Sequence, residues 1–528
     1  MDDLNPELIV GEACTVLGDP IVAPKAIGKT DLKALTITRG RFDRSKVRSY
    51  LEQIFDADEI AAMGHEGVDE RMMFGINPHY HALATGSALK DADGYELVPK
   101  MPPSKAILAL IMPRLNEALD LAGEADPSNQ MKYAPDTLSG KLLHKYDEIV
   151  LGYAAFACSA HCRYCYRLDL FNRTTGKGWV RPEQLRDYVR THNRELALNG
   201  GVDPETGCRR FPVREILLSG GDPMVMSNAK LYRYLEASGQ AGIKMVRIGT
   251  KEIAFRPQRF DAEFLKTLRL FHERYPDVHI NVVSHFSHPD EFLERDRDGR
   301  YIELEHRYKW LEAVERAVKG LLSLGFVSIE NQTPMIDRVN DDPEALHILH
   351  QELRQAGVRS KYIFQCREIQ GHRAFSVPLE RAWQIHNEAM KGLSDAARSR
   401  FVMSAEHGKT EVISLTEPPQ EESSVPRTNT AWSPLKRGLI VFRCHRSPSK
   451  DDLQGGLIIA IRNPEALWLS GYEDRIIYDC RPGGVNRLGV LAEQWLASAL
   501  AGAAEEGDAV PQEDAIETPL ATNTELVA

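Results

Sequence analysis

Three cysteines close together in the sequence have the spacing of an iron–sulfur cluster loop. Cys158, Cys162 and Cys165 follow the pattern C-x3-C-x2-C, which places three thiolates on one tight loop. Three thiolates can ligate three irons of a [4Fe–4S] cube and leave the fourth iron open. An open iron can bind and reduce S-adenosylmethionine (SAM), which starts radical chemistry in one class of enzymes. We therefore predict a radical-SAM cluster on this loop.

The alternative is a structural zinc site, or three buried thiols with no shared ligand. A structural zinc needs four ligands, commonly from two paired motifs, and the sequence has no second C-x2-C. Most of the other cysteines are expected to be small buried hydrophobic residues. These are Cys14, Cys208, Cys366, Cys444 and Cys480.

A second motif, Ser219-Gly220-Gly221-Asp222, follows the cysteines at the end of a predicted strand. A pair of glycines lets the backbone approach a ligand closely, and an aspartate can bind an ammonium group. Alone, the motif indicates only a turn. In radical-SAM enzymes this position binds the amino group of the methionine part of SAM, so we predict SAM contacts at all four residues.

The elements that must position these motifs alternate between strand and helix. Apolar runs predict strands at residues 149–156, 216–219, 245–249, 280–285, 327–332 and 362–365. Amphipathic helices are expected between them at residues 182–199, 228–238, 262–275, 308–324 and 343–356. This alternation implies parallel strands with right-handed crossovers. Since a closed barrel of this kind has eight strands, we predict an α/β fold with a partial (β/α)6 radical-SAM barrel and the chemistry at the strand C-termini.

The predicted domain organisation has four parts. An N-terminal arm and helical region covers residues 1–140, and the barrel covers 141–415. A C-terminal extension covers 416–497 and contains short predicted strands at 438–443, 456–462 and 475–478. The tail at 498–528 is rich in Ala and Glu and is expected to be disordered.

The composition fits a soluble globular protein. Its 528 residues are 43% hydrophobic and 27% charged, with a net charge of −11. The acidic charge argues against nucleic-acid binding, and no apolar stretch reaches the roughly 18 residues of a membrane helix. The N-terminus lacks the apolar core of a signal peptide, and the clustered cysteines favour a reducing compartment. We expect a cytoplasmic protein.

Taken together, the motifs resemble the lysine 2,3-aminomutase family, which uses a [4Fe–4S] cluster, SAM and pyridoxal 5′-phosphate (PLP). The resemblance spans roughly residues 140–415, in the family's order. The matching segments are 158–167, 217–222, 246–250, 257–259, 285–289, 331–332, 339–341, 364–366 and 408–410.

The resemblance implies that an amino group migrates from C2 to C3 of an amino acid. In such enzymes the cluster reduces SAM, and the released 5′-deoxyadenosyl radical removes a hydrogen from C3 of the substrate. The π-system of PLP then lets the nitrogen move. The resemblance also implies an electron donor, such as flavodoxin or ferredoxin, and a homo-oligomer.

Three residues are predicted to bind PLP on this resemblance. Lys409 aligns with the lysine that holds the cofactor as a Schiff base, although the segment before it, 404–408, is shorter than in the family. Lys145 and Tyr146 match a family His-Arg-Tyr segment that contacts the cofactor. The family has an arginine at the position of Lys145, and its planar guanidinium can form two parallel hydrogen bonds, whereas the ammonium of lysine is a compact point charge. A second arginine that the family carries nearby is missing here. We therefore expect the phosphate to be contacted differently here.

Further SAM and substrate contacts follow from the same resemblance. Tyr164 lies where the family has a histidine near the adenosyl group, and an aromatic ring can still stack there. His285 and Gln332 are also predicted to lie near SAM. Arg167 matches the arginine that binds the substrate α-carboxylate, a task that suits a planar guanidinium.

The substrate prediction depends on two positions. Lysine-acting members bind the side-chain ammonium with two aspartates, and the corresponding residues here are Arg367 and Ser404. The negative charges of both aspartates are therefore absent here. The cationic side chain of Arg367 would repel the side-chain ammonium of lysine and attract a carboxylate. Glutamate-acting relatives likewise carry a basic residue and a neutral polar residue in place of the two aspartates. We therefore predict that L-glutamate is converted to β-glutamate.

Several alternatives stay open at this point. Arg367 could instead point outward or pair with Glu368 or Glu406, and the substrate could be lysine, aspartate or another amino acid. A radical-SAM enzyme that acts on a peptide or nucleotide without PLP, and a non-catalytic cluster or zinc protein, are the other classes. Lysine-type members also carry a cysteine-bound zinc. Because Cys444 and Cys480 are isolated in the sequence, we predict no zinc.

Overall fold

The computed structural model describes most of the chain between residues 75 and 490. The gaps are 92, 112–119, 121, 125, 127, 139, 168–177, 206, 418–436 and 449–452, and residues 57, 493 and 497 are also described. The predicted N-terminal arm and the predicted tail at 498–528 lie outside the described residues. Within the described ranges, no helix combines the length and the apolar character needed to cross a membrane.

The described fold is an α/β fold built on one twelve-stranded sheet in the order β14-β13-β12-β11-β10-β9-β8-β7-β6-β5-β4-β3. The strands from β4 to β10 are parallel to their neighbours, and β3 and β11 to β14 pair antiparallel at the two ends. The parallel strands are β4 (Ile149–Ala155), β5 (Glu215–Gly220), β6 (Met245–Thr250), β7 (His279–Ser284), β8 (Val327–Met335), β9 (Arg359–Gln365) and β10 (Arg400–Ala405).

The six strands predicted from the apolar runs are present as β4 to β9. Strand β10 was not predicted and extends the parallel part of the sheet by one strand. It forms a tight hairpin with β11 (Gly408–Leu415), and only Glu406 and His407 lie between the two strands. The shortened segment before Lys409 is therefore a hairpin turn.

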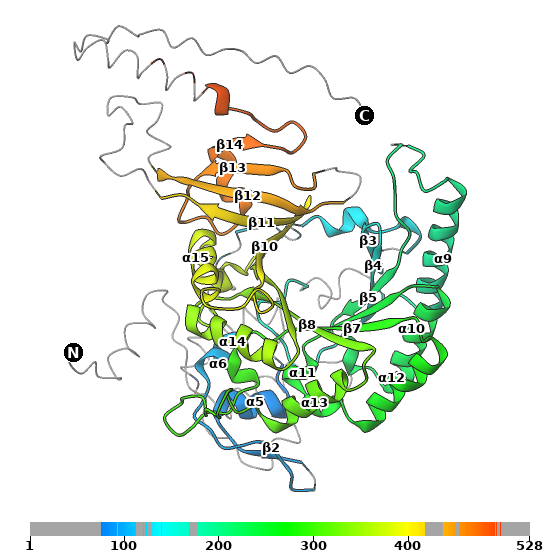
Figure 1. Cartoon of the computed structure of the whole chain (residues 1–528), viewed down its shortest axis with the longest axis vertical. Helices are drawn as coiled ribbons and strands as arrows, with labels where there is room; N and C mark the ends of the chain where they lie inside the picture. Colours follow the sequence, from blue (N-terminus) through cyan, green and yellow to red (C-terminus); the bar gives the residue numbers. More distant parts are fainter. Residues whose placement is uncertain are drawn as a thin grey trace, which may run out of the picture.

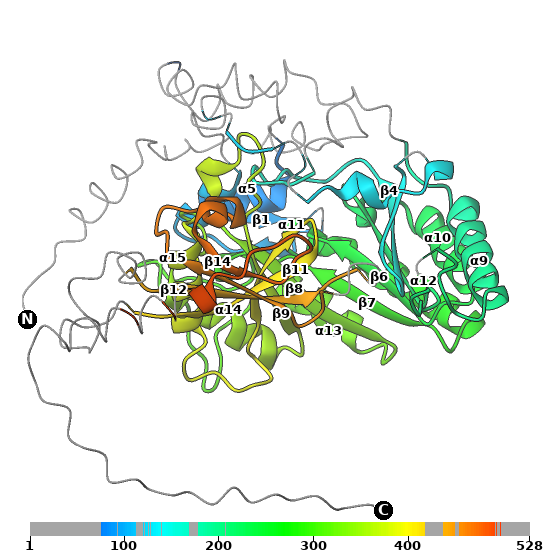
Figure 2. The same cartoon turned by 90° about the horizontal axis from the view of Figure 1, so that it is seen from above.

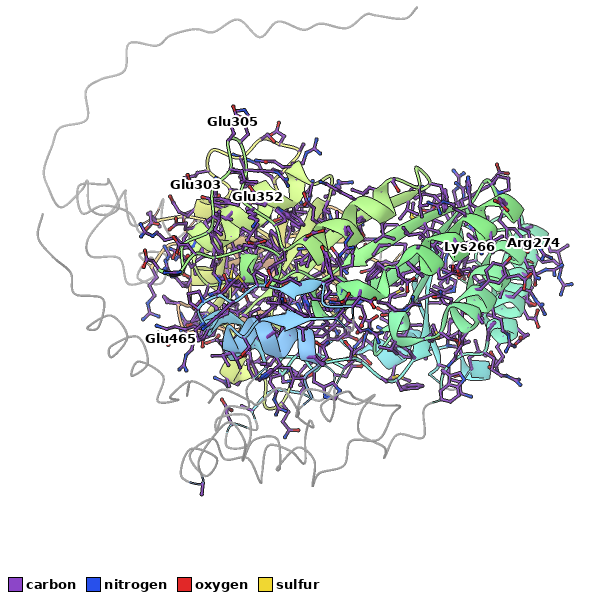
Figure 3. The ribbon with its side chains drawn as sticks, turned by 90° about the horizontal axis from the view of Figure 1, so that it is seen from below. Lys266, Arg274, Glu303, Glu305, Glu352 and Glu465 are labelled. Atoms are coloured by element: carbon purple, nitrogen blue, oxygen red, sulfur yellow. The ribbon has the colours of Figure 1, made fainter. Side chains whose placement is uncertain are left out.

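Helices follow the parallel strands and cover the outer face of the sheet. They are α9 (Pro182–Leu198), α10 (Asn228–Gln240), α11 (Glu252–Phe255), α12 (Ala262–Arg274), α13 (Glu312–Leu322), α14 (Pro343–Gln355) and α15 (Leu379–Ala389). Figure 1 shows α9, α10 and α12 side by side outside the strands. Helix α12 illustrates the amphipathic pattern, since Phe264, Leu268 and Phe271 are buried while Lys266 and Arg274 lie on the outer surface (Figure 3).

The sheet is strongly curved, and its two ends approach each other. In Figure 1, β3 and β4 lie across the interior of the molecule from β10 and β11. Lys145, on β3 (Leu142–Tyr146), donates a hydrogen bond to Ala405 O at the end of β10, with a length of 2.9 Å. Tyr133 Oη donates to Glu406 O in the adjacent turn. The segment before β4 thus contacts the far side of the sheet.

The N-terminal elements lie at one end of the molecule. They are α5 (Pro78–Thr85), β1 (Leu89–Lys90), β2 (Glu96–Val98) and α6 (Lys105–Ile111). Figure 2 shows α5 beside α11, and the buried ring of Tyr80 on α5 packs edge-on against Phe255 on α11. The helical region predicted within residues 1–140 is observed in part as α5 and α6, and residues 112–119 lie outside the described ranges.

Three strands of the C-terminal extension continue the same sheet. These are β12 (Leu439–Arg446), β13 (Leu457–Ile461) and β14 (Ile476–Asp479), close to the three short strands expected in the extension. Because β12 pairs with β11, it also lies next to the strand that carries Lys409. The division of the chain into four domains stays a prediction.

Candidate active site

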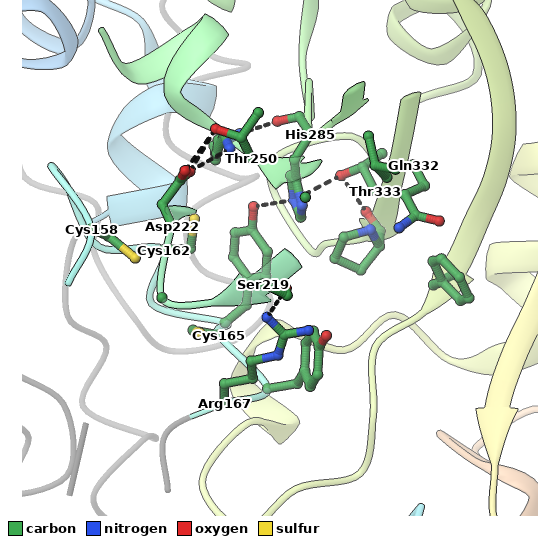
Figure 4. Close-up of a pocket in the computed structure, with 18 of the residues that line it drawn as sticks. Cys158, Cys162, Cys165, Arg167, Ser219, Asp222, Thr250, His285, Gln332 and Thr333 are labelled. Atoms are coloured by element: carbon green, nitrogen blue, oxygen red, sulfur yellow. Dashed lines mark hydrogen bonds between the residues drawn. The ribbon is translucent and has the colours of Figure 1, made fainter. Parts of the chain in front are cut away.

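One cavity of about 280 Å³ collects most of the predicted site residues. It lies at the C-terminal ends of the parallel strands, where the strand–helix alternation places chemistry. Figure 4 shows the cysteines on one side of the site, with Arg167 below and His285, Gln332 and Thr333 opposite. The predicted residues that line it are Cys158, Cys162, Cys165, Tyr164, Arg167, Ser219, Gly220, Gly221, Asp222, His285, Gln332, Arg367 and Ser404.

The cysteine loop is held by backbone contacts to the N-terminal helices. His161 N donates to Gly75 O and Arg163 N donates to Leu110 O, at 2.7 and 3.1 Å. On the other side, Ser159 N donates to the buried carboxylate of Glu252. The loop therefore has a fixed position between the N-terminal helices and the sheet.

The backbone at the start of the cysteine loop leaves no room for a side chain at Gly220 or Gly221. A Cβ atom at Gly220 would lie 2.1 Å from Ala155 O, and one at Gly221 would lie 2.5 Å from Ala157 O. Gly221 N and Asp222 N donate to these two carbonyls, each at 2.8 Å. The glycine pair thus has a packing role, because it sets the distance between β5 and the loop that carries the cysteines.

Replacing Gly220 by alanine is expected to destabilise the protein and to reduce its bound iron. Gly242→Ala is a matched control, since both glycines have positive φ (+120° and +76°) but nothing lies within 4 Å of a Cβ at Gly242. The control should cost about 1 kcal/mol of unfolding free energy, and Gly220→Ala about 3 kcal/mol or more. Denaturant unfolding and iron content measure both effects. Equal stability of the two variants would contradict the packing role.

A hydrogen-bond network connects the cysteine loop to β7 and β8. Tyr164 Oη lies 2.9 Å from His285 Nε2 and 3.1 Å from Ser287 Oγ, and Thr333 Oγ1 donates to Ser287 Oγ. Burial keeps the pKa of His285 well below its usual value, so its imidazole is neutral at pH 7. The Tyr164 and His285 rings also stack at a centroid distance of 5.9 Å, which fixes both rings at the cavity wall.

Beneath this network, Lys251 and Glu291 form a buried ion pair. Lys251 Nζ lies 2.5 Å from Glu291 Oε1 and also donates to His285 O. Tyr80 Oη, on α5, donates to the same carboxylate oxygen at 2.6 Å. The network therefore reaches from the N-terminal helices to the predicted SAM residues.

Asp222 lines the cavity with a carboxylate that already accepts several hydrogen bonds. Its donors are Thr250 Oγ1, Lys251 N and Met224 N, at 2.7 to 2.9 Å. Burial and then the charge of Glu252 raise the pKa of Asp222 to about 7. A bound ammonium group would stabilise the ionised form and lower this pKa. The predicted SAM contact at Asp222 stays a prediction.

Two arginines enclose the ring of Tyr166 at the opposite side of the cavity. The Arg367 guanidinium lies 4.2 Å from the ring centroid and that of Arg167 lies 4.8 Å away. Arg167 donates to Ser219 Oγ and to Gly220 O, and Arg367 donates to Ser404 Oγ at 3.1 Å. Among the described residues, no hydrogen-bond acceptor is bound to the buried atoms Arg167 Nε and Arg367 Nη1.

These contacts decide where Arg367 points. Its side chain enters the cavity, and the two carboxylates considered as alternative partners bind elsewhere. Glu368 accepts a hydrogen bond from Ser470, and Glu406 accepts from Asn129 and Lys132. Burial, together with the positive charge of Arg167, lowers the pKa of Arg367, while the charge of Asp126 opposes this shift.

Lys409 is absent from the cavity wall but lies on the same face of the sheet. In the antiparallel register, Lys409 on β11 is directly opposite Ser404 on β10, so the two side chains share a face. Its Nζ lies 3.9 Å from the Tyr362 ring centroid and 5.4 Å from that of Phe364, and Phe364 lines the cavity. The amine therefore lies directly behind the aromatic wall of the cavity.

The surroundings of Lys409 favour a neutral amine. Burial, and then the charges of Arg446, Lys361 and Arg247, lower the pKa of Lys409 well below its usual value, while Glu330 opposes them. A neutral lysine amine is a nucleophile that can attack an aldehyde. This arrangement fits a residue that binds PLP covalently.

The other predicted PLP residues lie on β3, outside the cavity wall. Lys145 Nζ, which donates to Ala405 O, also lies 5.0 Å from the Tyr133 ring centroid. Tyr146 packs under the guanidinium of Arg446, at 4.3 Å from its ring centroid. Both residues thus contact the strands that flank Lys409.

Several residues of the site were missed by the sequence prediction. Tyr166 lies between Cys165 and Arg167, so its place within the matched motif was a usable signal. Lys251 follows the matched segment 246–250 directly. Arg446 gave no signal, because it reaches the site only through the pairing of β12 with β11.

The cysteine motif supplies three thiols that could hold an iron–sulfur cluster. Three cysteines line the cavity, yet in the described part of the chain no three His, Cys, Asp or Glu side chains are close enough to hold one metal ion. The pair Cys444 and Cys480 is not isolated, since the Sγ atoms lie 3.8 Å apart. The prediction that no zinc binds remains untested.

Comparison with known proteins identifies relatives along most of the chain, although no family model matches it. A putative L-lysine 2,3-aminomutase of Aquifex aeolicus is 28% identical over 415 residues, which cover 78% of this chain and 90% of the relative. The L-lysine 2,3-aminomutase of Clostridium subterminale is 27% identical, covering 55% of this chain and 60% of the relative. The glutamate 2,3-aminomutase of Clostridioides difficile is 24% identical, covering 57% and 61%. These relatives are named as amino acid 2,3-aminomutases, which are isomerases, and their similarity over half to most of this chain supports its assignment to the lysine 2,3-aminomutase family.

Proposed function

We propose that this protein is a radical-SAM, PLP-dependent amino acid 2,3-aminomutase that acts on a dicarboxylic amino acid, with L-glutamate as substrate and β-glutamate as product. The observation that carries the proposal is the pair of arginines around Tyr166. Each presents a buried N–H without an acceptor among the described residues, at one cavity. Unpaired buried donors are costly, and two carboxylates of one substrate would satisfy both.

Arg367 is the residue that sets the side-chain preference in this proposal. It occupies a position where lysine-acting relatives carry an aspartate, and its hydrogen bond to Ser404 joins it to the second such position. A guanidinium here repels the side-chain ammonium of lysine and pairs with a γ-carboxylate. Arg167, fixed by Ser219 and Gly220, is then left for the α-carboxylate.

The proposed cofactors are a [4Fe–4S] cluster on Cys158, Cys162 and Cys165, SAM beside it, and PLP on Lys409. When bound, the cluster and SAM supply a radical that removes a hydrogen from C3, and PLP supplies the π-system through which nitrogen moves. The protein's own groups fix the geometry. The two arginines orient the substrate, the stacked Tyr164 and His285 rings form the wall near SAM, and neutral Lys409 holds PLP through Nζ.

The wider proposal concerns architecture and partners. We propose that the curved strands β4 to β9 correspond to the partial (β/α)6 barrel of radical-SAM enzymes, with β10 as an added strand. The contacts of Lys145 and Tyr133 across the sheet support this, because they link its two ends. An external electron donor such as flavodoxin or ferredoxin, and a homo-oligomeric state, belong to the same proposal.

A lysine-acting mutase is the second candidate, and the names of several relatives favour it. The lining of the cavity argues against it. A lysine substrate would place its ammonium near Arg367, and the carboxylate of Asp126, whose charge acts on Arg367, already accepts hydrogen bonds from Gln130.

An anaerobic product assay tests the proposal. Iron-reconstituted protein receives SAM, PLP and dithionite, with L-glutamate, L-aspartate or L-lysine offered separately, and β-amino acids are identified by NMR. β-Glutamate is expected. If SAM is cleaved but none of the three amino acids is converted, the proposed substrate class is wrong, and a peptide- or nucleotide-acting enzyme becomes the better candidate.

A further inference from the structure

Strand β12 places an arginine beside Lys409. In the antiparallel register Arg446 is directly opposite Lys409, and Lys409 is opposite Ser404. The register shifts between Lys409 and Thr410, so the place of the Arg446 side chain follows from its contacts: its charge acts on Lys409, and its guanidinium lies over the Tyr146 ring. Ser404, Lys409 and Arg446 are therefore neighbours on three adjacent strands.

Arg446 is a half-buried cation without a carboxylate partner among the residues that the structure describes. The other cations near Lys409 are compensated. Arg443 forms an ion pair with Glu411, and Arg247 and Lys361 both pair with Glu330. The positive charge next to Lys409 that is left for an anionic ligand is thus that of Arg446.

The ring of Tyr146 fixes the plane of the Arg446 guanidinium, at 4.3 Å from its centroid. Stacking restricts rotation and leaves the edge of the guanidinium, with its N–H groups, free to bind an anion. Lys145, at the neighbouring position of β3, is engaged with Ala405 O. The cation best placed for an anion near Lys409 therefore comes from β12, not from β3.

We propose that Arg446 binds the phosphate of the PLP held by Lys409, an inference that rests on the proposed function. The aldehyde and the phosphate-bearing arm of PLP are on adjacent carbons of its ring, so neighbouring side chains can hold both groups. A guanidinium binds a phosphate through two parallel hydrogen bonds, which a lysine cannot do. The C-terminal extension thus completes the cofactor site and replaces the arginine that the family carries on the segment matching Lys145.

The test compares PLP with pyridoxal, which has the same aldehyde but no phosphate. The full-length protein without cofactor is titrated with each compound, and binding is followed by the visible absorbance of the lysine-bound form. Arg446→Gln should weaken PLP binding about tenfold to a hundredfold and pyridoxal binding much less, since pyridoxal has no phosphate and is affected only through the raised pKa of Lys409. Arg446→Lys should recover part of the loss. Arg443→Gln, on the same strand, is the control and should retain the PLP affinity.

The outcomes separate this inference from the proposed function. Equal weakening for PLP and pyridoxal would overturn the phosphate assignment, because Arg446 would then act only through Lys409. An unchanged PLP affinity in a folded Arg446→Gln protein would also overturn it. If wild-type protein binds neither compound on Lys409, the proposed use of PLP is wrong and the inference falls with it. Thermal unfolding of every variant confirms that it is folded.

Discussion

Replacing Lys409 by arginine is expected to abolish covalent PLP binding and reduce aminomutase turnover below detection. Arginine keeps the positive charge and most of the volume, but its guanidinium does not form the bond to the cofactor aldehyde that a neutral lysine amine forms. Absorbance of the reconstituted protein and NMR of the products measure the two effects. The cluster and reductive SAM cleavage should persist, since Lys409 is on β11 and does not line the cavity beside the cysteines.

Lys391→Arg is the matched control for this experiment. Lys391 is exposed, pairs with Glu388 and lies just after α15, away from the cavity. It should retain PLP binding and activity. A Lys409→Arg protein that still binds PLP covalently would show that another lysine holds the cofactor, and the position of Lys409 behind Tyr362 and Phe364 would then have no catalytic meaning.

Replacing Arg367 by aspartate is expected to lower kcat/KM for L-glutamate by at least about two orders of magnitude. The substitution removes the partner of the side-chain carboxylate and adds a like charge, and the loss of one partner of a largely buried ion pair costs about 3 kcal/mol or more. Exchange of Ser404 for aspartate in the same protein should then admit L-lysine, because the double variant carries two negative charges at the end of the cavity.

The exposed Arg381, on α15, provides the control for this exchange. Arg381→Asp makes the same change of charge away from the cavity and should leave the glutamate kinetics unchanged. If Arg367→Asp converts L-glutamate as efficiently as the wild type, Arg367 does not contact the substrate, and the charge argument for an acidic substrate fails.

The parallel core of the fold was predictable from sequence because its strands are buried on both faces. Such strands are continuous apolar runs, and the helices between them are amphipathic, so both patterns are strong. The start of α9 at Pro182 and of α14 at Pro343 was predicted to the residue, since proline is favoured at the first position of a helix. Strand β10, residues Arg400–Ala405, was missed although its centre is apolar and buried.

The site was predictable only where a motif is local in sequence. The cysteine loop, Gly220, Gly221 and Arg167 belong to short matched segments, and the structure brings them to one cavity. The stacking of Arg367 on Tyr166 joins residues about two hundred positions apart, and the pairing of Lys409 with Arg446 depends on a strand outside the segments that resemble the family. Neither is encoded in a local pattern, so a three-dimensional structure was needed to find them.

The most direct measurement of the central claim is a competition assay. Wild-type reconstituted protein is given equimolar L-glutamate and L-lysine under anaerobic conditions, and the β-amino acids are quantified by NMR. Since the two substrates compete for one site, the product ratio reports the ratio of their kcat/KM values. Our account predicts that β-glutamate dominates. A predominance of β-lysine would keep the family chemistry and contradict the role of Arg367 and Ser404 in selecting an acidic substrate.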